Sequence, residues 1–178
     1  MNNKILIILL TSYLFSQNDL RSTQNLLSEN LKPFQDFISK TFKGEFANST
    51  LEKPVYDISR WERALNGNAI RIMHSINNGE YGGESIVMWD SGKESLVSWY
   101  FTTAGFYTQA TLHFENEKLI SIEDVTGNEN GITQVKAIIE LLPNGQLIKK
   151  SIYLMNGNWV DGHIIHYKET PDAQVLFR

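Results

Sequence analysis

The stretch that decides the fold runs from Gln146 to Lys168 and reads QLIKKSIYLMNGNWVDGHIIHYK. Two runs rich in β-branched and aromatic residues flank Asn156-Gly157, a pair that accepts the positive φ angles of a type I′ hairpin turn. Similar dipeptides separate other short runs: Asn66-Gly67, Asn78-Gly79, Ser91-Gly92 and Asn144-Gly145. A chain of hairpins predicts an up-and-down antiparallel sheet, and a sheet with this many strands is expected to close into a barrel without free edges.

The turn signals and the intervening runs predict ten strands, at residues 42–47, 55–65, 69–76, 84–90, 95–103, 106–115, 118–125, 132–142, 146–155 and 159–168. Apolar and polar residues alternate in several of them, as at Val135, Ala137 and Ile139. This period of two is typical of antiparallel strands that are buried on one face. Residues 95–101 are apolar on both faces, so we expect them to pack inside the barrel and also to lie under something outside, such as the N-terminal segment.

A short helix is expected before the first strand, at residues 33–41, because the proline at its start lacks the N–H that a first helical turn leaves unbonded. Phe34, Phe37 and Ile38 form its apolar stripe. Two positions stay open for this helix: a plug across one end of the barrel, or the outside of the barrel. The sequence GEYGGE at 79–84 predicts a wide hairpin turn with a glycine bulge, since it lacks the Lys-Ser/Thr ending of a phosphate loop.

The first residues are typical of an export signal. Lys4 precedes an apolar run from Ile5 to Phe15, which is too short for a bilayer because a spanning helix needs about 20 residues. We therefore expect residues 1–17 to be a signal peptide and residues 18–178 to form a single lipocalin-like barrel domain. The mature protein would be exported to the periplasm or the extracellular space, with no integral membrane segment. The alternative for this apolar run is a buried N-terminal helix.

The composition narrows the classes of function. The chain has 178 residues, 42% of them hydrophobic, which suits one domain with a substantial core. Its formal charge is −4 and no block of Lys and Arg occurs, so no nucleic-acid partner is predicted. The absence of cysteine excludes disulfides, thiolate metal sites and lipid attachment through an N-terminal cysteine.

Four stretches carry a resemblance to a known group of proteins: RWERALNG at 60–67, GEYGGE at 79–84, YFTTAGF at 100–106 and WVDGH at 159–163. Together with the export signal, the short helix and KGEF at 43–46, they make the chain resemble calycin-like barrels, meaning lipocalins, fatty-acid-binding proteins and nitrobindin-like haem proteins. The closest resemblance is to an exported bacterial family of unknown function in that group. The resemblance implies a calycin-like barrel from residue 33 onward, and not a particular activity.

The aromatic residues are the best indication of a ligand. A barrel of this strand number can hold a small molecule between apolar walls and a few polar groups, so we predict that it binds a small apolar or amphipathic molecule. Arg60, Arg63 and Arg71 are natural partners for a carboxylate head group. The candidate ligand-binding residues are Arg71, Trp89, Trp99, Tyr100, Trp159 and His163.

The sequence predicts no catalytic or metal-ligating set. His163 and His166 lie three residues apart on one strand, so they point to opposite faces and cannot form a zinc pair. No two carboxylates have a spacing that places them together. By resemblance to the nitrobindin-like proteins, a single histidine near the C-terminus implies a haem ligand, and His163 is the candidate.

Two further functions stay open beside ligand binding. One is an interaction module of the cell envelope, in which aromatic rings fill the barrel and the outer surface is functional. The other is a barrel enzyme that uses Glu84, Asp161 or His163. An open interior with a buried charge favours binding or catalysis, whereas a filled interior favours the interaction module.

Overall fold

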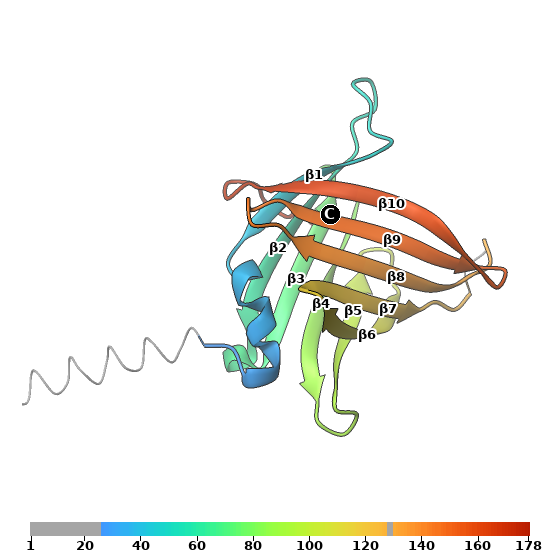
Figure 1. Ribbon diagram of the computed structural model, residues 1–178. Helices are drawn as coiled ribbons and strands as arrows, with labels where there is room; N and C mark the ends of the chain where they lie inside the picture. Colours follow the sequence, from blue (N-terminus) through green and yellow to red (C-terminus); the bar gives the residue numbers. More distant parts are fainter. Residues whose placement is uncertain (1–25, 128–129) are drawn as a thin grey trace, which may run out of the picture.

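The computed structural model describes residues 26–127 and 130–178. The expected signal peptide, residues 1–17, lies outside the described residues. Within the described part, ten strands form one closed antiparallel barrel, in which neighbours in the chain pair with each other and β1 closes the ring against β10 (Figure 1). The predicted all-β fold, an up-and-down barrel of ten strands with a short N-terminal helix, is confirmed. The fold is compatible with a calycin-like barrel.

The strands are β1 (Thr41–Phe46), β2 (Tyr56–Ala64), β3 (Ala69–Ile76), β4 (Tyr81–Asp90), β5 (Ser95–Thr102), β6 (Tyr107–Glu115), β7 (Lys118–Asp124), β8 (Ile132–Leu141), β9 (Leu147–Met155) and β10 (Asn158–Glu169). Two 3-10 helices accompany them, η1 (Glu29–Phe37) and η2 (Leu65–Gly67). All predicted strands except the fourth begin within one residue of the prediction. Alternation and turn residues therefore locate the strands well.

β4 is the exception, because it begins at Tyr81 and includes two glycines that were predicted to form a wide turn. Glycine is needed at these two positions because the neighbouring strands lie too close to leave room for a side chain. A Cβ atom on Gly83 would lie 2.4 Å from the Tyr100 ring, and one on Gly82 would lie 2.5 Å from the carbonyl oxygen of His74. The two glycines thus allow β3 and β5 to approach β4 closely, which is a recognised role of glycine inside a strand.

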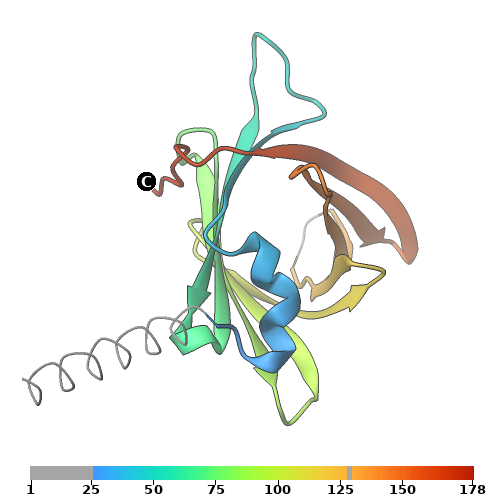
Figure 2. The same ribbon diagram turned by 60° about the vertical axis from the view of Figure 1, so that its left-hand side comes forward.

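η1 lies across one end of the barrel, as Figure 2 shows. It begins and ends four residues earlier than predicted: Pro33 lies inside the helix and not at its start, and the chain becomes extended at Ile38. The ring centroids of Phe34 and Phe114 lie 5.0 Å apart, and those of Phe37 and Trp61 lie 4.8 Å apart. Of the two positions that the sequence left open, η1 therefore takes that of the plug.

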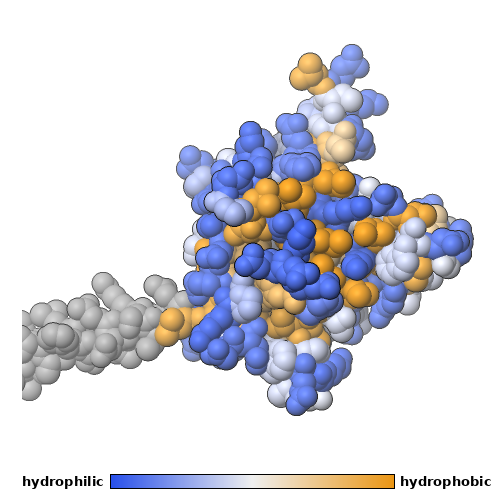
Figure 3. All heavy atoms as spheres, in the orientation of Figure 1, coloured by the Kyte–Doolittle hydropathy of each residue, from blue (hydrophilic) through white to orange (hydrophobic). Residues whose placement is uncertain are grey.

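The outer face of β5 is less covered than predicted. Val97 is buried, but Trp99 is only half-buried and Phe101 is 51% exposed. The C-terminal tail packs against β3 instead, where the backbone N–H of Leu176 donates to the hydroxyl of Ser75 at 3.1 Å. Figure 3 shows hydrophobic and hydrophilic side chains interspersed over one face of the barrel.

Candidate functional site

A cavity of about 320 Å³ lies inside the barrel. It exists because many inward positions carry small side chains, one on each of six strands: Ser59, Ser85, Ser98, Ala110, Ser121 and Ala137. Larger side chains at these positions would fill the interior. Ligand pockets generally measure about 300–1,000 Å³, so this cavity suits a small molecule.

The cavity has an apolar end and a polar end. On four strands the inward residues change from apolar to polar over four positions: from Trp61 to Asp57, from Ile70 to His74, from Leu96 to Tyr100 and from Leu119 to Glu123. The apolar members belong to the hydrophobic cluster that also contains Phe34 and Phe37 of η1. Four residues of a strand span about 13 Å, so the charged and phenolic groups lie well away from the helix.

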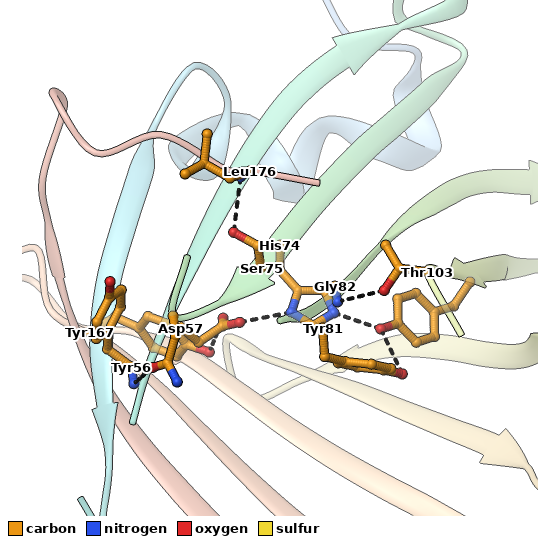
Figure 4. Close-up of polar contacts among 11 residues, drawn as sticks. Tyr56, Asp57, His74, Ser75, Tyr81, Gly82, Thr103, Tyr167 and Leu176 are labelled. Carbon is orange, nitrogen blue, oxygen red and sulfur yellow. Dashed lines mark hydrogen bonds and ion pairs between the residues drawn. The ribbon is translucent and has the colours of Figure 1, made fainter. Parts of the chain in front are cut away.

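Five side chains from five strands form a hydrogen-bonded chain across the polar end. Asp57 is its second member, after Tyr167: Oδ2 accepts from the Tyr167 hydroxyl at 2.9 Å and Oδ1 lies 2.7 Å from Nδ1 of His74 (Figure 4). Nε2 of His74 lies 2.6 Å from the Tyr100 hydroxyl, and that hydroxyl lies 3.2 Å from the hydroxyl of Tyr81. Two of these contacts join strands that are not neighbours in the sheet: Asp57 and Tyr167 connect β2 with β10 past β1, and His74 and Tyr100 connect β3 with β5 past β4. The chain therefore adds cross-links through the interior to those of the sheet.

Two phenols in this chain, Tyr100 and Tyr167, are held in their protonated forms. Burial raises the pKa of Tyr100 well above its usual value, and the hydrogen bond to Tyr81 adds to the shift. Burial, together with the charge of Asp57, likewise raises the pKa of Tyr167. Tyr167 is therefore a donor to Asp57. The carboxylate also fixes a proton on Nδ1 of His74, which directs Nε2 to Tyr100.

Charged groups also line the wall formed by β7, β9 and β10. Burial raises the pKa of Glu123, opposed by the Thr108 hydroxyl and the Lys149 ammonium. Burial lowers the pKa of His163, and the charge of Lys149 lowers it further, while that of Asp57 opposes the shift. Glu123 and His163 are therefore both shifted toward their neutral forms.

The surroundings of His163 bear on the haem hypothesis in two ways. Its Nδ1 lies 2.7 Å from the Tyr153 hydroxyl and its Nε2 lies 3.3 Å from the Ser151 hydroxyl, so a bond to iron would break one of these contacts. Lys149 and Glu123 line the same cavity, and their charges would be costly to bury against an apolar macrocycle. Among residues 26–127 and 130–178, no group of three His, Cys, Asp or Glu side chains could hold a metal ion.

Two of the six predicted ligand-binding residues, Tyr100 and His163, line the cavity. The other four lie elsewhere. Arg71 pairs with Glu84 at 2.6 Å on the outer face, and Trp89 packs against the hydrophobic cluster without lining the cavity. Trp99 is half-buried on the outer face of β5, since its neighbour Tyr100 points inward, and Trp159 is 49% exposed.

The remaining candidates from the sequence also lie away from the cavity. Arg60 pairs with Glu62 at 2.7 Å, and Arg63 donates to the carbonyl oxygen of Leu26 at 2.9 Å. Asp161, a candidate for an enzyme, pairs with Lys150 at 2.7 Å. Glu84 is held by Arg71, so neither carboxylate of the proposed enzyme faces the cavity.

The sequence did not single out Asp57 or Lys149 as site residues, and it gave His74 no role. One signal was available, namely the period of two along each strand. His74 shares the inward face of β3 with Ile72 and Ile76, and Lys149 shares the inward face of β9 with Leu147. A charged residue in phase with such a face is a candidate for the interior.

Comparisons with known proteins do not assign the chain to a family, because its sequence matches no family model and no curated protein. None of the helices in the described part is long and apolar enough to cross a membrane.

Proposed function

We propose that the barrel binds a small amphipathic molecule in its interior. The observation that carries this proposal is the cavity of about 320 Å³, which is apolar beside η1 and polar at its other end. Ligand sites typically combine such apolar walls with a few polar groups that orient the ligand. The cavity also favours binding over the alternative of an interaction module, because that alternative requires a filled barrel.

Filling the cavity is expected to abolish binding. Ala110 lines the cavity, so Ala110→Phe places a ring in the space that the ligand would occupy. The matched control is Thr111→Phe, which adds the same ring at an exposed position next in the chain. Native mass spectrometry of protein purified from its own host should show a small molecule on the wild type and on Thr111→Phe, and none on Ala110→Phe. A molecule retained by Ala110→Phe would contradict the proposal.

We also propose that the protein acts outside the cytoplasm, in the periplasm or the extracellular space, as a member of the exported bacterial family that it resembles. The support is the positively charged start followed by the short apolar run from Ile5 to Phe15. N-terminal sequencing of the protein from its host is expected to find a mature chain that begins near Gln17. Exported protein that still carries residues 1–15 would overturn this proposal.

A further inference from the structure

Lys149 is a cation in the cavity wall that forms no direct ion pair with any described residue. It lies on β9. Within the described residues, its ammonium makes no hydrogen bond and has no carboxylate oxygen within 4.0 Å. The next residue, Lys150, faces the opposite side of the strand and lies 2.7 Å from Asp161. The outward lysine of this pair is therefore neutralised, and the inward one is not.

The charged groups around Lys149 do not replace that missing partner. Glu123 faces the cavity from β7 and His163 faces it from β10, and burial shifts the pKa of each toward the neutral form. Asp57, on β2, is already engaged by His74 and Tyr167. A charge that leaves water without a matched partner is strongly unfavourable, so an occupant that brings a negative charge would be preferred.

Hydroxyl groups in the same cavity also lack partners. Four serines line it, and none of their hydroxyls forms a hydrogen bond within the part of the chain that the structure describes: Ser59, Ser85, Ser98 and Ser121. Water can satisfy them while the cavity is hydrated. A plain hydrocarbon would displace this water and leave the hydroxyls unbonded, which disfavours binding. The occupant is therefore expected to carry oxygen atoms beyond its charged group.

We infer that the cavity binds a small amphipathic carboxylate, with its carboxylate beside Lys149, additional oxygen atoms against the serine hydroxyls and its apolar part toward η1. This inference rests on the proposed function and specifies the class of ligand. Hydrogen bonds between an ammonium and a carboxylate are about twice as strong as neutral ones. The arginines that the sequence offered as carboxylate partners do not line the cavity, which leaves Lys149 to fill this role.

The test uses three probes with the same eight-carbon chain: octanoate, 3-hydroxyoctanoate and octan-1-ol. Isothermal titration calorimetry is expected to show that octanoate binds the wild type about tenfold more tightly than octan-1-ol, and 3-hydroxyoctanoate at least as tightly as octanoate. Lys149→Met should remove this preference and leave the affinity for octan-1-ol unchanged, which also verifies that the variant is folded. The matched control, Lys150→Met, should bind all three probes as the wild type does.

A second variant asks whether Glu123 competes with the ligand for Lys149. Glu123→Gln removes an acidic group of the cavity wall on which Lys149 acts electrostatically, while keeping its shape, so octanoate should bind at least as tightly as it binds the wild type. Any of three results would overturn the inference. The wild type could bind octanoate and octan-1-ol with equal affinity, Lys149→Met could bind octanoate as the wild type does, or Glu123→Gln could bind octanoate more weakly. If none of the probes binds but a molecule is still released from host-purified protein, the carboxylate inference fails alone. If no molecule is released either, the proposed function fails with it.

Discussion

Replacing Phe34 with alanine is expected to lower the free energy of unfolding by about 3–5 kcal/mol, the usual range for truncating a buried phenylalanine. Phe34 is fully buried, and its ring centroid lies 5.0 Å from that of Phe114 and 6.4 Å from that of Trp61. These contacts join η1 to β6 and β2. The loss is large because η1 has no strand partner and is held across the barrel mainly by the apolar side chains that it buries.

Equilibrium unfolding in urea measures this loss. The matched control is Phe101→Ala, which removes the same side chain from a position that is 51% exposed and should cost less than about 1 kcal/mol. A loss below about 1 kcal/mol for Phe34→Ala, or equal losses for the two variants, would mean that η1 does not seal the barrel.

The strands could be predicted because the information for them is local. At Asn156-Gly157 both residues adopt positive φ angles, 51° and 78°, as the turn dipeptide predicts. A tight hairpin turn does not require such a dipeptide, however. Asn116 and Glu117 form an equivalent turn with φ angles of 49° and 64° and no glycine. That hairpin was found only from the apolar runs on either side of it.

The site could be predicted only in part, because its geometry depends on distant strands. Alternation indicates that Tyr100 and His163 share a face with apolar neighbours, and both line the cavity. It does not reveal that Asp57 on β2 meets a tyrosine on β10, 110 residues later. The cavity itself arises from small side chains on six separate strands, a property that no single stretch of sequence displays.

Large or charged side chains were an unreliable guide to the interior. Trp99 and Arg71 were chosen for their chemistry, yet each lies one residue away from an inward position and so faces outward. Lys149 and Lys150 make the same point, because two identical side chains in succession have different surroundings. The phase of a residue along its strand carries more information about the site than its type does.

Replacing Asp57 with alanine is expected to cost about 2–5 kcal/mol of the free energy of unfolding, because two donors lose their acceptor and each unsatisfied buried donor costs about 1–3 kcal/mol. Asp57 is 4% exposed and accepts the hydroxyl proton of Tyr167 as well as facing Nδ1 of His74. The substitution leaves both donors, the Tyr167 hydroxyl and Nδ1 of His74, without their acceptor. It also frees the His74 ring that directs Tyr100 into the cavity.

Urea unfolding of Asp57→Ala should be compared with that of Asp161→Ala, which removes a carboxylate whose side chain is 79% exposed. The exposed pair with Lys150 should contribute less than about 1 kcal/mol. A double-mutant cycle with His74→Phe then isolates the contact between Asp57 and His74, since the cost of Asp57→Ala should be smaller once the imidazole is gone. An unchanged cost in the His74→Phe background would show that the two side chains do not act together, and that the hydrogen-bonded chain is not a unit that shapes the polar end of the cavity.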